Sequence, residues 1–469
     1  MAHKLFDIVS NGEYAPRRPS AVEREAARRV ADAADAAGRR LGIDRRTFLR
    51  SSLGTATALL ALGACSEEQG ASNGRTTTSG AFELPPETTT EPDAAGEVLG
   101  PGDGEVVIDV QTHFLDPNTG FGNAFPQSAC GDATCFDVDH WADLVLGSSD
   151  TSMAVLSAIP VVSDPRPMSI EKMEEARRLA ESLCGDDRVL LQGEAFPQIG
   201  SLPDFLDGME TLAGDHDIVA WKTYTHVGGG YTFADERGQA FLAQVEELAA
   251  AGAGPAVVCV HKGFGADPAD LGPAAAAHPD LTFVAYHSGF ESGNVEGPFD
   301  EAGGGVDRLL VSLRDAGIGA GANVYCELGS TWFSVLRDPE AAAHTVGKIL
   351  AAVGPERVLW GTDSIWYGSP QDQIDAFRAF EITEDAQAAF GYPALTAEVK
   401  RAIFGGNAAR LHGIDLATVG EPCRFSAEER DAAREEAFGR LGGVGERTLG
   451  PRTADAARAT FLTEHPWFS

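Results

Sequence analysis

The stretch that decides the fold is "VVIDVQTHF", residues 106–114, an apolar run that ends in polar residues. Side chains alternate along a β-strand, so Asp109, Gln111 and His113 would share one face of it. Polar groups at the end of a buried strand indicate a functional site when other strands bring further polar groups to the same place. The rest of the sequence therefore has to be searched for such strands.

Seven further runs of strand-like composition follow, at residues 151–160, 188–196, 218–226, 255–262, 281–288, 323–329 and 357–364. Several are almost continuously apolar, as expected for parallel strands covered on both faces. Amphipathic stretches with helical spacing and glycine near their ends separate them. Eight strands alternating with helices predict a (β/α)8 barrel, with a doubly wound sheet as the alternative.

The barrel prediction can be checked against the chemistry of the strand ends, because such barrels carry their sites at the carboxyl ends of the strands. Polar residues do end most of the predicted strands, although they are far apart in the sequence. They are His113, Glu194, Lys222, His226, His261, His287, Glu327 and Asp363.

Four of these residues, His113, His261, His287 and Asp363, have side chains that suit a divalent metal. Imidazole and carboxylate ligands fit zinc, with manganese as the second choice, and a catalytic zinc lowers the pKa of a bound water towards neutrality. We expect His287 and Asp363 to handle protons. The alternative for any single histidine is a hydrogen-bonded core residue.

We expect Lys222, His226 and Trp366 to contact the substrate. Lys222 and His226 share a face of their strand. Lys222 is either a carboxylated bridging ligand or a partner of Glu194 or Asp363. The aromatic residues that follow strand ends either line a substrate pocket or pack in the core, and they are Trp332, Trp366 and Tyr367.

The N-terminal region has the pattern of an export signal. The arginine pair in "DRRTFLRSS" (44–52) precedes the short apolar run "LGTATALLALGAC" (53–65), which is shorter than the roughly 18 residues of a membrane-spanning helix. This pattern predicts twin-arginine export, a route that typically carries folded proteins, to the periplasm or cell surface. Residues 62–65 also resemble a lipobox, which would anchor the chain by a lipid on Cys65. The alternatives are ordinary signal cleavage or a buried helix.

These patterns divide the chain into four parts. Residues 1–65 are the predicted signal region, and residues 66–104 form a predicted flexible linker, because they are rich in Ser, Thr, Gly, Pro and Glu. Residues 105–414 are the barrel, and residues 415–469 are a C-terminal helical extension that could contact a second subunit. The oligomeric state is left open.

Composition and charge fit a soluble globular enzyme. Hydrophobic residues make up 43% of the chain and charged residues 23%. A net charge of −34 argues against binding nucleic acid, which needs clustered Lys and Arg. Among the seven cysteines, Cys130 and Cys135 lie close enough in sequence to form a disulfide in an exported protein. Cys259 and Cys326 lie in apolar strands and are predicted to be buried free thiols.

Taken together, these motifs resemble the amidohydrolase superfamily, and within it the amidohydrolase-related group that includes aminocarboxymuconate semialdehyde decarboxylase. The resemblance covers residues 105–414. It rests on the motifs "IDVQTHF", "VCVHKG", "AYHSGF", "LWGTDSIW" and "GGNAARLHGI". It implies metal ligands at His113, His261 and Asp363, a water-activating His287, and structural roles for Asn407 and Arg410.

One residue departs from the family pattern. Gln111 stands where the family has the other first-strand histidine, and an amide is a weaker ligand for zinc than imidazole. The residue therefore leaves open a metal site of altered affinity or a barrel without metal.

The resemblance implies an exported hydrolase that uses a metal-activated water on a small carbonyl-containing substrate. One alternative is a non-oxidative decarboxylase of the same group, and another is a catalytically degenerate surface binding lipoprotein.

Overall fold

We describe a computed structural model of the whole chain. Its described residues are 3–7, 9–14, 17–74, 78–116, 119, 136–161, 166–291, 293 and 296–438.

The core of the molecule is a parallel sheet of eight strands in sequential order, β2 to β9, so the predicted (β/α)8 barrel is confirmed. The strands are β2 (Val107–Thr112), β3 (Thr151–Leu156), β4 (Val189–Glu194), β5 (Ile218–Tyr224), β6 (Val257–His261), β7 (Thr282–Tyr286), β8 (Val324–Glu327) and β9 (Val358–Leu359). The first and last strands meet through a hydrogen bond from the Val110 N–H to the Trp360 carbonyl and a parallel bridge between Thr112 and Ser364.

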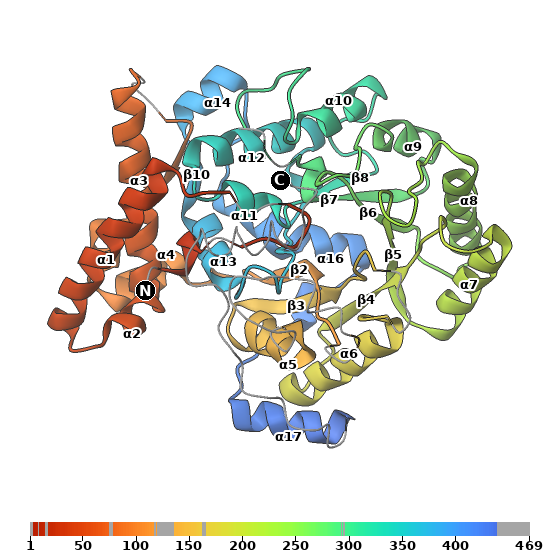
Figure 1. Cartoon of the computed structure of the whole chain (residues 1–469), viewed down its shortest axis with the longest axis horizontal. Coiled ribbons are helices and arrows are strands. Elements are labelled where there is room, and N and C mark those ends of the chain that lie inside the picture. The colour runs from red at the N-terminus through yellow and green to blue at the C-terminus, as the bar shows by residue number, and fades with distance from the viewer. Residues whose placement is uncertain are drawn as a thin grey trace.

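Helices surround the barrel on its outer face (Figure 1). They are α5 (Val138–Trp141), α6 (Ile170–Cys184), α7 (Leu202–Asp215), α8 (Glu236–Ala250), α9 (Leu271–Ala277), α10 (Asp307–Asp315), α11 (Thr331–Val335), α12 (Pro339–Val353) and α13 (Gln371–Ala379). Every residue of β2 and β3 is buried. The strands can therefore be apolar on both faces, as the sequence predicted.

The C-terminal part of the barrel is tied to its last strand by a single asparagine. Three short helices follow α13, at α14 (Glu384–Phe390), α15 (Ala397–Arg401) and α16 (Asn407–His412). The buried Asn407 amide donates to the carbonyls of Pro355, at 2.8 Å, and Val358, at 2.6 Å. The Arg410 guanidinium in turn donates to the Asn407 side-chain oxygen. These contacts give both residues the structural role that the family resemblance implied.

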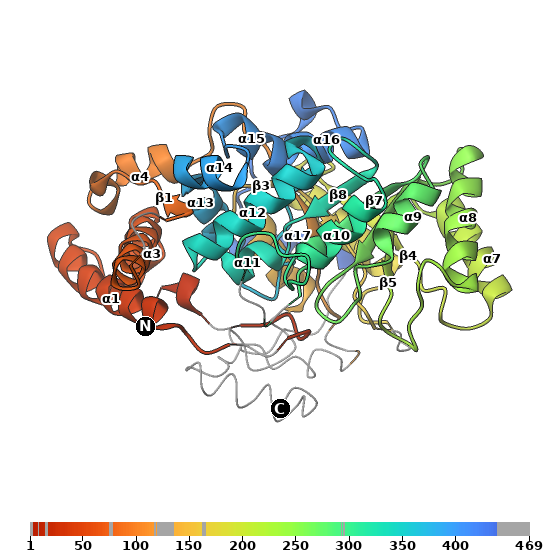
Figure 2. The ribbon, with the colours of Figure 1, turned by 90° about the horizontal axis from the view of Figure 1, so that it is seen from above.

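The N-terminal region packs against one side of the barrel in Figures 1 and 2. It contains α1 (Ala21–Leu41), α2 (Arg45–Leu49) and α3 (Ser52–Ser72). Cys65 is buried in α3 with 4% of its surface exposed, and its lipidation stays a prediction. No helix among the described residues is long and apolar enough to cross a membrane.

The segment 66–104, predicted as a flexible linker, contains regular structure instead. Strand β1 (Gly80–Phe82) pairs antiparallel with β10 (Phe380–Ile382), and α4 (Pro92–Leu99) buries Ala95 and Leu99. Composition alone suggested disorder, because this segment has no apolar periodicity of its own. Its order comes from pairing with a distant strand.

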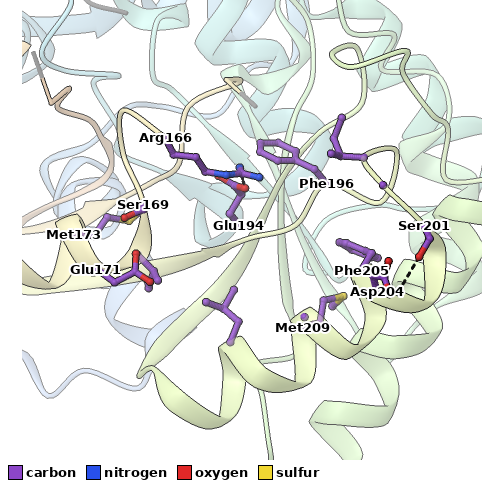
Figure 3. Close-up of a pocket in the computed structure, with 15 residues that line it drawn as sticks. Arg166, Ser169, Glu171, Met173, Glu194, Phe196, Ser201, Asp204, Phe205 and Met209 are labelled. Carbon is purple, nitrogen blue, oxygen red and sulfur yellow. Dashed lines mark hydrogen bonds and ion pairs between the residues drawn. The ribbon is translucent and has the colours of Figure 1, made fainter. Parts of the chain in front are cut away.

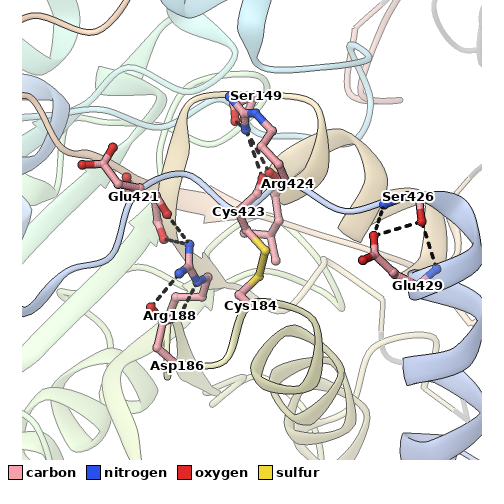
Figure 4. Close-up of a disulfide and its surroundings, with 11 residues drawn as sticks. Ser149, Cys184, Asp186, Arg188, Glu421, Cys423, Arg424, Ser426 and Glu429 are labelled. Atoms are coloured by element: carbon pink, nitrogen blue, oxygen red, sulfur yellow. Dashed lines mark hydrogen bonds and ion pairs between the residues drawn. A yellow bond between two sulfur atoms is a disulfide. The ribbon is translucent and has the colours of Figure 1, made fainter.

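A disulfide joins the end of α6 to the C-terminal extension. Cys184 and Cys423 are bonded, with their Cα atoms 5.5 Å apart and a sequence separation of 239. Figure 4 shows Arg188 beside this bond, where it donates to the Glu421 carbonyl at 3.1 Å. The sequence analysis did not find this pair, because 239 residues of spacing carry no local signal.

The remaining cysteine predictions can be checked in part. Cys259 and Cys326 are buried free thiols, as predicted. Cys130 and Cys135 lie outside the described residues, so their predicted disulfide stays a prediction. Within the described range the C-terminal extension contains the 3-10 helix η10 (Leu416–Thr418) and the α-helix α17 (Ala427–Phe438).

Removing the disulfide should destabilise the fold without changing the barrel. We expect Cys423→Ser to lower the free energy of unfolding by about 2–4 kcal/mol, since the bond restricts the unfolded chain. Denaturant unfolding measures the change. A reducing agent should bring the parent to the stability of the equally reduced variant. Equal stability of parent and variant under oxidising conditions would contradict the assignment of this bond.

Candidate active site

The strand ends bring the four candidate residues of the sequence analysis into one buried cluster. His113, His261, His287 and Asp363 are each at most 2% exposed. His113 Nε2 lies 3.1 Å from Asp363 Oδ1, and His287 Nε2 lies 3.0 Å from His261 Nδ1. Residues that are 250 positions apart therefore share one site because the barrel closes.

Backbone carbonyls orient all three imidazoles. His113 Nδ1 lies 2.6 Å from the Ser157 carbonyl, and His287 Nδ1 lies 2.7 Å from that of Gly329. His261 Nε2 lies 3.1 Å from the Gly263 carbonyl. A carbonyl can only accept, so each of these nitrogens carries the proton and donates it. The other nitrogen of each ring presents a lone pair to the centre of the cluster, as in histidines that bind metals.

The cluster consequently has more hydrogen-bond acceptors than protons to share among them. The facing nitrogens of His287 and His261 both present lone pairs across 3.0 Å, which is repulsive unless a proton or a cation lies between them. Burial lowers the pKa of His287 to about 4, and burial likewise holds the pKa of His261 well below its usual value. An extra proton is therefore disfavoured at neutral pH, and a cation satisfies both rings.

The spacing of these atoms also fits a metal. Two ligand atoms that each lie about 2.1 Å from one ion are separated by roughly 3.0 Å at a right angle and roughly 3.4 Å at the tetrahedral angle. The pairs His113–Asp363 and His261–His287 lie at 3.1 and 3.0 Å. Each pair thus has the spacing of two ligands of one ion, and among the described residues the ligand atoms of His261 and His287 also lie within 4.8 Å of a carboxylate oxygen of Glu13.

Asp363 is held as an ionised carboxylate. Burial raises the pKa of its carboxyl group, but the neighbouring His113 and His287 and the Ser330 hydroxyl outweigh burial and bring the pKa to about 2. The Ser330 Oγ donates to Asp363 Oδ2. Asp363 can therefore accept a proton or bind a cation at neutral pH.

Gln111 occupies the place expected from the sequence. Its Nε2 donates to Asp363 Oδ1 at 3.0 Å and lies 3.5 Å from both His113 Nε2 and His287 Nε2. Its Oε1 is buried without a hydrogen-bond partner among the described residues. The oxygen and nitrogen of an amide are assigned from such contacts, and a flipped amide would present the oxygen to the cluster as a ligand.

The backbone around the cluster is strained where it carries the functional side chains. His287, Ser288, Ser330 and Asp363 have φ values of 60°, 49°, 56° and 56°. Non-glycine residues rarely adopt positive φ, and such strain gathers at functional sites, where the surrounding structure enforces it.

Glu327 holds part of this strained backbone in place. Its carboxylate accepts the His287 N–H at 2.9 Å and also accepts the Gly329 N–H. A Cβ atom on Gly361 would overlap the Glu327 carboxylate, which explains the glycine in the eighth-strand motif. Glu327 is a support for His287, and it forms no ion pair within the part of the chain that the structure describes.

The predicted pairing of Lys222 with Glu194 or Asp363 is wrong. Lys222 Nζ has no hydrogen-bond partner in the described part of the chain and instead lies 3.5 Å from the centre of the Tyr286 ring. Burial lowers the pKa of Lys222 to about 8. Glu194 forms its ion pair with Arg166, which comes from a loop outside the barrel.

Two of the expected substrate contacts lie beside the cluster. The His226 ring lies 4.7 Å from that of His261. The Trp366 Nε1 lies 3.3 Å from Asp363 Oδ1. Tyr367 reaches the Ser330 hydroxyl, whereas Trp332 packs against Phe377 in the core. The structure therefore places Trp366 and Tyr367 beside the cluster and Trp332 in the core, a distinction that the sequence did not allow.

A cavity of about 450 Å³ opens near the carboxyl end of β4. Figure 3 shows Arg166, Glu194 and Phe196 at one end of it and Ser201 and Met209, from the start and middle of α7, at the other. Glu194 ends a barrel strand, so the cavity lies on the same side of the barrel as the histidine cluster.

Sequence reasoning missed two site residues. Asn11 and Glu13 come from the N-terminal segment that was set aside as a signal region. The Asn11 Nδ2 donates to Asp363 Oδ2 at 3.0 Å, and Glu13 Oε1 lies 3.5 Å from His261 Nδ1. Burial raises the pKa of Glu13 to about 8. No motif surrounds these residues, so only the fold could place them.

The fold and the site define a class of protein, the (β/α)8 barrels that gather histidines and a carboxylate at the carboxyl ends of their strands. Residues 108–414 match the family model described as amidohydrolase. The chain belongs to this family.

Solved structures with the same fold share little sequence with the chain. They include 2,6-dihydroxybenzoate decarboxylase from Rhizobium, at 15% identity over 66% of this chain and 99% of the other, with a TM-score of 0.39. The 5-carboxyvanillate decarboxylase of Novosphingobium aromaticivorans, complexed with manganese and 4-hydroxy-3-methoxy-5-nitrobenzoic acid, shows 14% identity over 67% and 98%, with a TM-score of 0.41. A putative 2-pyrone-4,6-dicarboxylic acid hydrolase from Pseudomonas putida shows 15% over 66% and 98%, also with 0.41.

A comparison with functionally curated proteins finds no match. The assignment to the family therefore rests on the family model alone.

The support that Glu327 gives to His287 can be tested by adding a methyl group next to it. We expect Gly361→Ala to lower the free energy of unfolding by roughly 1–3 kcal/mol, because a buried carboxylate has to move. Gly96→Ala, at an exposed helical position with open space, should stabilise by roughly 0.5–1 kcal/mol instead. Thermal unfolding measures both. Equal effects of the two changes would contradict the close approach.

Proposed function

We propose that the protein is a metal-dependent hydrolase that acts on a small carbonyl-containing substrate. The observation that carries this proposal is the pair of neutral imidazole lone pairs of His261 and His287, which face each other across 3.0 Å next to an ionised carboxylate. Such an arrangement favours a divalent cation over an empty site.

His113, His261 and Asp363 would hold the ion, with His287 beside them and Gln111 as a weak further ligand. Imidazole and carboxylate ligands favour zinc, with manganese as the alternative. A divalent ion bound there supplies Lewis acidity, which lowers the pKa of a water molecule towards neutrality and polarises a substrate carbonyl.

The chain's own groups would move the proton. His287 is neutral at pH 7 because burial lowers its pKa to about 4, so it can accept a proton at Nε2. Asp363 can accept one at Oδ1, where His113 and Trp366 also orient the carboxylate. Both acceptors lie close to the same atom, Gln111 Nε2, at 3.0 Å from Asp363 and 3.5 Å from His287, so they face one region of the site, as general base catalysis on a single substrate requires.

A second candidate is a non-oxidative decarboxylase of the same family. The observation that favours it is the Glu13 carboxylate, which lies in the cluster beside His261. A site that accommodates this carboxylate can accommodate that of a substrate, which would leave as CO2 before a proton is delivered to the product.

We further propose that the chain is exported by the twin-arginine route and anchored by a lipid at Cys65. The disulfide between Cys184 and Cys423 supports an oxidising compartment, since such bonds are rare in the cytosol.

Metal content tests the proposed centre directly. We expect the parent to hold about one zinc or manganese ion per chain, Asp363→Ala to lose it, and Gln111→His to bind it more tightly, because imidazole is the better ligand. Elemental mass spectrometry measures the content. Metal in Gln111→His alone would mean that the amide disables the site, and a binding role without catalysis would then replace the proposed hydrolase.

Product analysis separates the two reactions. Amides, lactones and aromatic acids are offered to the metal-loaded protein, and we expect hydrolysis of an amide or lactone without release of CO2. His287→Ala should lower kcat by about 10²-fold or more, since it removes a positioned proton acceptor. Release of CO2 from an aromatic acid would favour the decarboxylase.

A further inference from the structure

The N-terminal segment enters the candidate active site from outside the barrel. Figures 1 and 2 show the red N-terminal segment running from the side of α1 across one end of the barrel. Its residues Val9 and Asn11 are buried. The Tyr14 ring stacks on that of Phe264, with centroids 5.3 Å apart, and the Tyr14 hydroxyl lies 3.4 Å from that of Tyr367. The segment is therefore packed into the mouth of the barrel.

Glu13 is the residue of this segment that reaches the histidines. Its side chain is 16% exposed, and Oε1 lies 3.5 Å from His261 Nδ1. One carboxylate oxygen of Glu13 and one ring nitrogen each of His261 and His287 lie within 4.8 Å of one another. Among the described residues, this is the set of three whose ligand atoms come close enough to share one ion.

The distance between the Glu13 carboxylate and the His261 ring suits two ligands of one ion better than a hydrogen bond. A separation of 3.5 Å between Glu13 Oε1 and His261 Nδ1 is at the outer limit of a hydrogen bond. It matches the roughly 3.4 Å between two ligands of a tetrahedral ion. The other oxygen of Glu13 accepts from Asn11 Nδ2 at 2.6 Å, and that amide also donates to Asp363 Oδ2. Asn11 thus orients two carboxylates towards the same centre.

We propose that Glu13 is a ligand of the metal centre, contributed by the N-terminal segment in addition to the ligands of the barrel. This inference rests on the proposed metal-dependent function. Glu13 Oε1 joins His261 Nδ1 as a ligand, and His287 Nε2 lies within 4.8 Å of both atoms, where it stays free to accept a proton. A carboxylate from the segment compensates for Gln111, the weak ligand of the first strand.

This assignment has a consequence for the predicted signal region. Glu13 lies within residues 1–65, so it is a ligand only while that region is attached, and the cleavage before Cys65 that the proposed lipid anchor requires would remove it. Removal of that region would take one ligand away and open the centre to a substrate.

The experiment measures metal affinity in the full chain. The parent, Glu13→Gln and Asp7→Asn are stripped of metal and titrated with zinc and, separately, with manganese in competition with a chelator. Asp7→Asn is the matched control, because it makes the same carboxyl-to-amide change in the same segment. We expect Glu13→Gln to raise the Kd for the metal by at least about tenfold, since loss of a residue that only supports a ligand already lowers metal affinity by about 10–100-fold. Asp7→Asn should leave the Kd unchanged.

One further variant and one further measurement distinguish loss of a ligand from loss of folding. Glu13→Asp retains a carboxylate and should recover part of the affinity, which a general loss of folding would not allow. The absorption spectrum of the cobalt-loaded protein should change in Glu13→Gln and not in Asp7→Asn.

An unchanged Kd and spectrum in Glu13→Gln, with loss of metal in Asp363→Ala, would overturn the ligand role of Glu13 and leave the proposed function intact. A lower KM in Glu13→Gln at unchanged Kd would likewise overturn it, because the carboxylate would then only occupy the place of a substrate. A parent that binds neither ion would overturn both the inference and the proposed function.

Discussion

The structure depends on the hydrogen bonds by which one buried carboxylate closes the barrel. Asp109 on β2 accepts the backbone N–H of Gln111 at 3.2 Å and that of Thr362 at 3.0 Å, and the Thr362 hydroxyl also donates to it. Because Thr362 follows the last strand, one side chain links the two ends of the sheet. Burial raises the pKa of Asp109 to about 7, so this link uses a group whose charge is costly to bury unless those donors are present.

Closure at this point creates the site as well as the fold. Asp363 follows Thr362 directly, and His113 is two residues beyond Gln111, so the bonds of Asp109 bring the His113 imidazole and the Asp363 carboxylate together at 3.1 Å. The backbone has to adopt positive φ at Asp363 to turn its side chain inwards. Strain of this kind persists only where the surrounding contacts enforce it, and the bonds of Asp109 and Glu327 do so here.

The sequence predicted the parts of this arrangement that follow from local patterns. Apolar runs with polar ends identified all eight strands, and the barrel rule placed His113, His261, His287 and Asp363 in one site. It did not predict contacts that depend on long-range placement. Cys184 and Cys423 lie 239 residues apart, and β1 becomes a strand only by pairing with β10. Asn11 and Glu13 were set aside because composition and the arginine pair described a signal region, and neither pattern carries information about a binding site.

Gln111 shows how an amide and a metal compete for the same acceptors. Its Nε2 donates to Asp363 at 3.0 Å and faces two imidazole lone pairs, so this amide group offers two protons to three acceptors. Those two protons are too few for the cluster. The His261 and His287 nitrogens still oppose each other, and the Gln111 oxygen is buried without a hydrogen-bond partner among the described residues. Rotation of the amide by half a turn would remove both protons and add a fourth acceptor. A divalent cation would interact favourably with all of these acceptors at once. Gln111 therefore has two effects: it is a weaker ligand than the histidine it replaces, and it leaves the site short of positive charge.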